Sequence, residues 1–155
     1  MTLEEAITKR KSVRSYKEGE VTPEEILKLL WAASRTPSAG AVRALKIYEV
    51  RDVEKKKELC IACLNQKSVE QAAIDLVIAV NYEPVLKRYG KRGYRYALME
   101  AGHMGQNISL MAVELGLGTV MIGTFSDGRV KEVMGIPEDP LYVIPIGRID
   151  AVSQT

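Results

Sequence analysis

The sequence predicts a single domain in which helices alternate with four strands, and three observations support this. The chain has 155 residues, an ordinary size for one domain with its own hydrophobic core. Apolar residues recur at helical spacing in some segments and alternate or run together in others. Short breaks rich in Gly, Pro, Ser and Asn separate these segments, without a long linker or an internal repeat. We therefore expect residues 1–155 to form one domain.

The composition is that of a globular protein with little excess charge. Hydrophobic residues make up 46% and charged residues 27%, and 22 basic against 20 acidic side chains leave a net charge of +2. This balance argues against nucleic acid or a membrane as the main partner. The two cysteines, Cys60 and Cys63, exclude a disulfide framework, and we expect both to be buried as small hydrophobic residues. No metal site is predicted. The charged amphipathic start lacks a signal-peptide core, so we expect a cytoplasmic protein.

Helical spacing of apolar residues predicts five helices, over residues 2–10, 22–35, 53–64, 95–115 and 126–134. Two of them begin with a capping box, formed by Thr2 with Glu5 and by Thr22 with Glu25. The helix over 95–115 is the longest, and polar residues interrupt its apolar run, which excludes a transmembrane span. Glycines at 116 and 118 end this helix.

The long helix carries small residues along one flank, which would let another backbone approach closely. These residues are Ala101, Gly102, Gly105, Ser109 and Ala112.

Four strands are predicted, over residues 44–50, 72–81, 119–122 and 141–149. The run over 72–81 is almost entirely apolar, which is typical of a strand buried on both faces. Pro145 in the last strand suits an edge position or a bulge, since proline cannot donate a ladder hydrogen bond.

Two short segments have the residue types that an anionic, planar ligand requires. Arg10, Ser12 and Arg14 alternate, so an extended backbone would put two guanidinium groups and a hydroxyl on one side, as a phosphate site needs. A solvated basic turn is the alternative. The loop over residues 37–40, Pro-Ser-Ala-Gly, would allow a flat ligand to approach backbone amides, and the alternative is an ordinary turn.

The segment over residues 82–94 mixes four cations with three tyrosines. Such a mixture binds nucleic acid in some proteins, but without a protein-wide excess of charge we favour a lid over a flat ligand or a plain surface loop. The sequence has no GxGxxG after its first strand and no GxxxxGK[ST], so Rossmann and P-loop nucleotide sites are poorly supported. Neither a nucleophile elbow nor HExxH occurs.

Five short motifs in their order along the chain resemble the nitroreductase-like flavoprotein family over residues 4–149. They are Arg10-x-Ser12-x-Arg14, Pro37-Ser38-Ala39-Gly40, Gly105-Gln106-Asn107 before Leu115-Gly116-Leu117-Gly118, Ile122-Gly123-Thr124-Phe125 and Pro145-Ile146-Gly147-Arg148. The stretch over 88–95 with Glu100–His103 is most similar to the branch that contains the heterocycle-forming dehydrogenases.

The resemblance implies an α+β three-layer sandwich, with a mixed, mostly antiparallel sheet flanked by helices. It also implies a homodimer that has the long helix at its interface and holds two FMN molecules. The resemblance also implies the flavin contacts. Arg10 and Ser12 meet the phosphate and the ribityl chain, and Arg148 joins the phosphate. Arg14 lies near the pyrimidine edge of the flavin ring, Gln66 reaches its polar edge, and Gly123 or Thr124, after Ile122, addresses N5 through a backbone amide. The other subunit covers the ring with its loop Pro37, Ser38, Ala39 and Gly40.

The implied activity is an FMN-dependent oxidoreductase that passes hydride from NADH or NADPH through flavin N5 to a small aromatic, nitro, quinone or flavin acceptor by ping-pong turnover. No side-chain acid or base is expected, and His103 is interpreted as a packed or interface residue. Three alternatives remain open: an azoline dehydrogenase partner in a larger complex, a flavin-binding protein without turnover, and a nucleic-acid binder that uses the basic segment.

The chain departs from the family pattern in two places. Many relatives follow the Pro-Ser loop with Asn and then Gln-Pro, whereas Ala41, Arg43 and Ala44 stand here. The chain is also short for the family, so the helices that often cover the substrate pocket are missing. The segment over 82–94 is then expected to cover it.

Overall fold

The structure is a computed structural model that describes residues 1–150. In chain order the elements are α1 Leu3–Lys9, α2 Pro23–Ser34, the 3-10 turn η1 Ala39–Ala41, β1 Leu45–Val50, α3 Val53–Ala62, α4 Lys67–Gln71, β2 Ile74–Val80, α5 Glu83–Tyr89, α6 Arg92–Glu114, β3 Leu117–Thr119, α7 Asp127–Met134 and β4 Asp139–Arg148. Residues 151–155 of the predicted domain lie outside the described residues.

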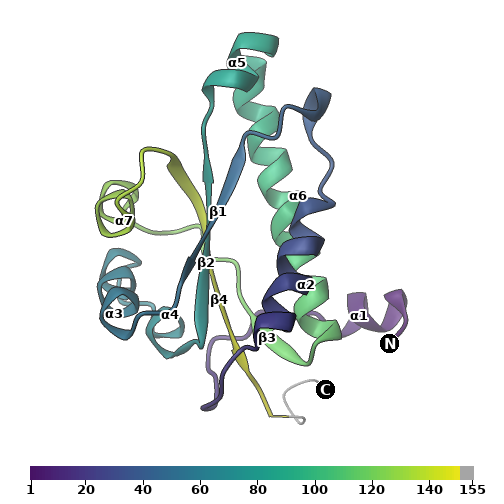
Figure 1. Cartoon of the computed structure of the whole chain (residues 1–155), viewed down its shortest axis with the longest axis vertical. Coiled ribbons are helices and arrows are strands. Elements are labelled where there is room, and N and C mark those ends of the chain that lie inside the picture. The colour runs from purple at the N-terminus through teal and green to yellow at the C-terminus, as the bar shows by residue number, and fades with distance from the viewer. Residues whose placement is uncertain (151–155) are drawn as a thin grey trace.

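The four strands form one antiparallel sheet in the order β1-β2-β4-β3, and helices cover both of its faces (Figure 1). Strand β2 is buried along its whole length, as predicted, because both faces are covered. Its residues Ile74, Leu76 and Ile78 face α2 and α6, while Val77 and Ala79 face α3 and α7. The predicted α+β three-layer sandwich is confirmed.

Local sequence signals set the helix starts as expected. Both capping boxes are present: the Thr2 hydroxyl accepts from the Glu5 amide at 3.1 Å, and the Thr22 hydroxyl accepts from the Glu25 amide at 3.2 Å. Gly116, which follows the C-cap residue Leu115 of α6, has a φ of +70°, a conformation that glycine adopts without a steric penalty. None of the helices in residues 1–150 is long and apolar enough to cross a membrane.

The segment over 82–94 is helical, so its interpretation as a plain surface loop is wrong, and a lid over a ligand stays a prediction. Helix α5 occupies most of it, and α6 begins three residues before the predicted start. The Asn81 side chain accepts from the Glu83 amide at 3.1 Å, and Pro84 lies in the first turn, where it leaves no hydrogen bond unmade. The charges in this segment concealed ordinary helix-start signals.

Two predicted strands differ from the structure in their details. The third strand lies over Leu117–Thr119 rather than 119–122, and Ile122 makes only an isolated bridge to Val143. Pro145 lies in β4, an interior strand, whereas the register shift falls near Leu141. The pairing of β4 with β3 ends at Ile146, so residue 145 has no ladder partner on that side. Proline is tolerated there because its missing N–H leaves no ladder hydrogen bond unmade. Helix α4 was not predicted, since five residues give too little periodicity to recognise.

The small residues of α6 pack inside the protein's own chain. Ala101, Gly105, Ser109 and Ala112 are buried, and a Cβ on Gly105 would clash with the Met121 side chain. Of the five small residues predicted along this flank of α6, only Gly102 has open space where a Cβ would lie. The close approach predicted from this pattern therefore serves the packing of α6 on its own subunit.

Candidate functional site

The segment over residues 10–17 runs along the edge of the sheet at the lower end in Figure 1. Ser12 pairs with Thr119 of β3, where the Val13 amide donates to the Thr119 carbonyl at 2.9 Å, and Lys17 pairs with Arg148. The backbone pairing thus brings the predicted N-terminal site segment next to the predicted C-terminal one.

Two glycines of the sequence motifs make room for this segment. A Cβ on Gly118 would lie 2.9 Å from Val13 Cγ1, and one on Gly147 would lie 2.8 Å from Tyr16 Cγ. The Tyr16 hydroxyl donates to the Val13 carbonyl at 2.7 Å, and burial raises the pKa of this phenol. Both glycines therefore allow the close backbone approach that holds residues 10–17 in place.

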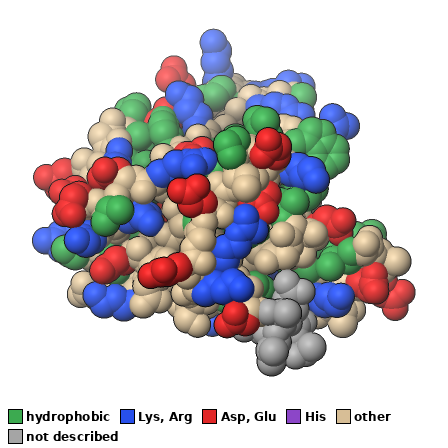
Figure 2. All heavy atoms as spheres, turned by 60° about the horizontal axis from the view of Figure 1, so that its bottom comes forward, with side chains coloured by type: hydrophobic (Ala, Val, Ile, Leu, Met, Phe, Trp, Pro, Cys, Tyr) green, Lys and Arg blue, Asp and Glu red, His purple; other side chains and the backbone are tan. Residues whose placement is uncertain are grey.

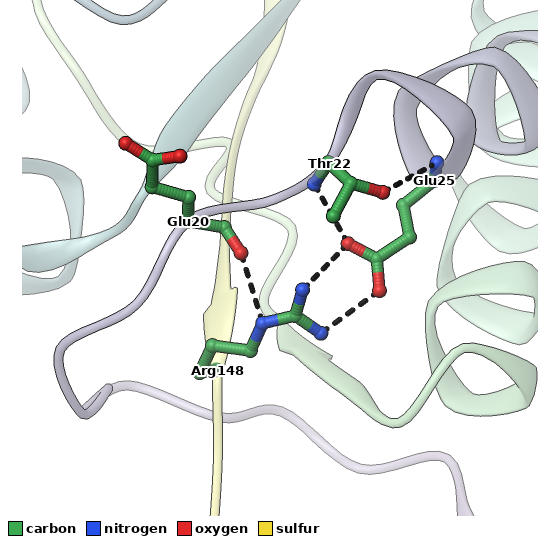
Figure 3. Close-up of polar contacts among 4 residues, drawn as sticks. All are labelled: Glu20, Thr22, Glu25 and Arg148. Atoms are coloured by element: carbon green, nitrogen blue, oxygen red, sulfur yellow. Dashed lines mark hydrogen bonds and ion pairs between the residues drawn. The ribbon is translucent and has the colours of Figure 1, made fainter.

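The predicted phosphate ligand Arg148 has a protein partner that the sequence analysis missed. Its Nη1 and Nη2 donate to the two carboxylate oxygens of Glu25 at 2.8 and 2.7 Å, and its Nε donates to the Glu20 carbonyl at 2.9 Å (Figure 3). Although burial raises it, the pKa of Glu25 is held below its usual value by Arg148 and Thr22. Since a guanidinium has five N–H donors, two remain for another acceptor.

Arg10 and Arg14, in contrast, form no ion pair or side-chain hydrogen bond with any residue in 1–150. Arg14 and Ser12 are exposed and Arg10 is half-buried. Figure 2 turns the lower end of the molecule toward the viewer and shows several Lys and Arg side chains together near its centre. The guanidinium groups of Arg10 and Arg14 are therefore free to bind an anion.

The residues predicted to contact the edge of the flavin ring lie further along the chain after β3, on the same side of the sheet's edge pairing with β4. Ile122 is buried and bridges to Val143, whereas Gly123 and Thr124 are exposed. Within residues 1–150 the amides of Gly123 and Thr124 donate no hydrogen bond. The side-chain amide of Gln66 donates to the Thr124 carbonyl at 2.8 Å and to the Cys63 carbonyl at 2.9 Å. Its carbonyl oxygen therefore remains available as an acceptor.

The loop Pro37–Gly40 lies at the opposite, upper end of the molecule, between α2 and β1 (Figure 1). Gly40 has a φ of +55°, and its carbonyl accepts from Arg88 at 2.9 Å. Within one chain the structure thus does not bring Pro37, Ser38, Ala39 and Gly40 together with Arg10 and Ser12.

A buried carboxylate fixes this loop, and the sequence analysis did not single it out. Glu100 of α6 is 5% exposed and accepts from the Ser38 hydroxyl at 3.1 Å, while that hydroxyl accepts from the Arg43 amide at 2.9 Å. Burial raises the pKa of Glu100, and Ser38, Arg43 and His103 oppose that shift. Arg43 also donates to the Ser34 and Thr36 carbonyls at 3.3 Å, so it anchors the loop within its own chain.

Large apolar side chains are exposed on the layer that contains α1, α2 and α6. They are Leu3, Ile7, Leu27, Trp31, Leu98 and Met99, each more than half exposed. A groove of about 320 Å³ between these helices is lined by Leu3, Trp31 and Met111 among others. So much exposed apolar surface is typical of an interface with another protein chain.

The remaining candidates carry no site chemistry. Cys60 and Cys63 are buried and reduced, as predicted, and burial raises the pKa of Cys63 to about 12. Asp75 is fully buried without a hydrogen-bond partner in residues 1–150, and burial raises its pKa well above the usual value. In that part of the chain no three His, Cys, Asp or Glu residues gather as metal ligands.

Free cations, unbonded amides and an available carbonyl oxygen along one sheet edge are the groups that an anionic ligand with a polar edge needs. Comparison with known proteins gives the family of the chain. The model of the family described as "Nitroreductase family" matches residues 7–148. The chain therefore belongs to the nitroreductase family.

Individual relatives agree with this assignment. A candidate nitroreductase of Methanocaldococcus jannaschii is 40% identical, over 94% of this chain and 90% of its own length. The NADPH-flavin oxidoreductase of Vibrio harveyi is 30% identical, over 87% of this chain but only 60% of its own length. The solved structure of the Vibrio harveyi NADPH:FMN oxidoreductase with NAD+ superposes with a TM-score of 0.86 at 28% identity, covering 95% of this chain and 68% of that one.

Proposed function

We propose that this protein is a homodimeric FMN-dependent oxidoreductase that uses NADH or NADPH as the electron donor. One observation carries the proposal: free cations at Arg10 and Arg14 and unbonded amides at Gly123 and Thr124 lie along the same sheet edge. Ser12 is paired with Thr119, only four residues before Gly123. Four residues of extended chain span at most about 14 Å, which suits a ligand with a phosphate at one end and a ring at the other.

The donor set fits FMN group by group. Arg10 and Ser12 hold the phosphate, and Arg148 adds the two N–H donors that Glu25 leaves free. Arg14 lies near the pyrimidine edge, where its charge stabilises the negative charge of reduction. The carbonyl oxygen of Gln66 accepts from the polar edge of the ring. An amide of Gly123 or Thr124 donates toward N5 and fixes the orientation of the ring.

A second copy of the chain completes this site. The loop Pro37–Gly40 is far from Arg10 in its own chain, and the apolar faces of α2 and α6 are exposed beside it. A dimer through these faces covers the apolar surface and lets the loop of one subunit cover the flavin ring of the other. His103, exposed on α6, lies in or near this interface and has no acid–base role.

Bound FMN supplies the redox chemistry, because it accepts a hydride from the nicotinamide and passes it to an acceptor. The chain's own residues bind and orient the reactants. The donor and a small aromatic, nitro, quinone or flavin acceptor use one pocket in turn, which gives ping-pong kinetics. Names of relatives such as the NADPH-flavin oxidoreductase support the donor and the flavin.

An absorbance spectrum of the purified protein, followed by anaerobic addition of NADH or NADPH, tests the proposal. We expect the near-ultraviolet and blue bands of bound flavin, and bleaching by at least one nucleotide. A colourless protein that does not take up added FMN contradicts flavin binding. A yellow protein that neither nucleotide bleaches contradicts the reductase activity and favours a flavin-binding protein or a dehydrogenase that works without nicotinamide.

A further inference from the structure

The end of α5 and the start of α6, with the turn between them, carry a dense group of cations that the flavin site does not use. We call this group the basic corner, and its members are Lys87, Arg88, Lys91, Arg92 and Arg95. The nine residues from 87 to 95 contain no acidic residue, and within residues 1–150 no member of the corner forms an ion pair. Other cations are paired, such as Lys46 with Glu138 at 2.7 Å and Lys131 with Asp139 at 3.1 Å.

The basic corner is built on packed helices. A Cβ on Gly93 would lie 2.7 Å from the Val85 carbonyl oxygen, so α5 and α6 touch where no side chain intervenes. The rings of Tyr82 and Tyr94 pack edge to face with their centroids 4.9 Å apart, and those of Tyr89 and Tyr96 do so at 5.1 Å. The cations therefore project from a fixed position.

Helix stability explains only two of these charges. Lys87 and Arg88 lie in the last turn of α5, where cations interact favourably with the helix dipole. Lys91, Arg92 and Arg95 lie at the start of α6, which has no acidic residue in its first turn and no side-chain cap, and there the interaction is unfavourable. A bound anion would reverse the penalty for these three.

The basic corner also borders the proposed flavin pocket. Arg88 donates to the carbonyl of Gly40 at 2.9 Å, and Gly40 belongs to the loop that covers the partner's flavin in the proposed dimer. Tyr94, between Arg92 and Arg95 in the sequence, is 47% exposed and offers a flat surface for a base. Cations and an exposed ring within the basic corner match the phosphates and the adenine of a dinucleotide.

We propose that the basic corner selects NADPH over NADH by binding the 2′-phosphate of the nicotinamide dinucleotide. This inference rests on the proposed function. The 2′-phosphate is a monoester with a charge of roughly −1.5 to −2, whereas each phosphorus of the shared diphosphate carries one charge. Several unpaired cations therefore favour the dinucleotide that has the monoester.

The test uses the FMN-loaded protein and the double variant Lys91→Gln/Arg95→Gln, which spares the Arg88 contact to the loop. We expect the KM for NADPH to rise by about tenfold or more, as the loss of a charged hydrogen bond predicts. The KM for NADH and the FMN content should change less than twofold. The matched control Lys55→Gln/Lys57→Gln, on α3 at the other face of the sheet, should leave both KM values unchanged.

A binding measurement separates this inference from the proposed function. Calorimetry should show that adenosine 2′,5′-bisphosphate binds the wild type more tightly than AMP does, and that the double variant loses this difference. If NADPH bleaches the flavin but the double variant keeps the wild-type preference, the basic corner does not select the nucleotide. If a single-stranded oligonucleotide binds the corner more tightly than the bisphosphate does, the corner is a nucleic-acid site and the inference is wrong. Absence of flavin or bleaching would instead contradict the proposed function.

Discussion

Two cation-rich regions lie at opposite ends of the molecule and differ in how they are held. The N-terminal one, with Arg10 and Arg14, is an extended segment paired to β3 and β4, next to glycines that admit it. The basic corner stands on two packed helices beside the loop Pro37–Gly40. One ligand cannot bridge the two ends within a chain, yet both border the proposed site. The proposed site therefore requires two copies of the chain.

The largest expected effect comes from breaking the interface that would join these regions. Leu98→Glu places a charge on the exposed apolar face of α6, where Leu98 is 52% exposed. We expect monomers in sedimentation and complete loss of bound flavin, because desolvating an unpaired charge in an interface is costly. The control Ile61→Glu alters a residue on α3 that is also 52% exposed and should leave dimer and flavin intact. A flavin-loaded Leu98→Glu monomer would show that one chain suffices.

The next largest effect concerns the N-terminal region alone. Arg10→Ala removes an unpaired cation at the proposed phosphate and should weaken FMN binding by roughly 10- to 100-fold. Flavin fluorescence titration measures this, and the loss should shrink as salt is raised. Arg129→Ala, which removes an exposed cation on α7, is the control. Equal affinities for the two variants would separate the N-terminal region from FMN.

The ion pair between Glu25 and Arg148 gives the next prediction, which concerns the stability of the protein. Glu25→Gln removes a half-buried bidentate partner and should lower the free energy of unfolding at pH 7 by about 1–3 kcal/mol. The pKa of Glu25 is lowered in the folded protein, so its stabilisation is present above its unfolded value near 4.5 and is lost as pH falls through the folded value. Denaturant unfolding at pH 7 and below pH 4 measures both.

The same variant makes a second readout possible. Releasing Arg148 from Glu25 should leave FMN affinity unchanged or tighter, because more guanidinium donors become free for the phosphate. A marked loss of FMN affinity without a stability change would mean that Glu25, not Arg148, is the group the flavin needs.

The smallest expected effect is at His103. His103→Gln keeps a polar side chain on the exposed face of α6 and should change flavin reduction less than twofold in stopped-flow measurements. A loss of more than about tenfold would give this histidine a part in proton transfer.

The sequence predicted the fold well wherever a local rule governs the backbone. The capping boxes at Thr2 and Thr22, the long helix and the fully apolar run of β2 follow from periodicity and hydrogen-bonding rules. The segment over 82–94 was misread because its charges hid the start signals at Asn81 and Pro84. The small residues of α6 predicted a close contact but not its partner, because periodicity shows which residues share a flank and not what that flank contacts.

Part of the candidate site could not be predicted, because it depends on contacts between distant segments. Motif order pointed to Arg10, Ser12 and Arg148, and the structure adds that Ser12 pairs with Thr119 of β3 while Lys17 pairs with Arg148 of β4. That Glu25 holds Arg148, and that Glu100 holds Ser38, arises from side chains more than 60 positions apart meeting in the fold. Glu25 had been recognised only as a capping residue, and it serves both purposes.

A purified heterodimer of two defective chains tests the shared site most directly. One chain carries Arg10→Ala and the other carries Ala39→Glu, which puts a charge where the loop should cover the ring. Each homodimer should bind FMN at least about tenfold more weakly than the wild type. If the site is shared, the heterodimer has one intact site and should bind one FMN per dimer with the wild-type affinity. If both segments serve the same chain's flavin, both sites stay defective, and a heterodimer without a site of wild-type affinity would contradict the account.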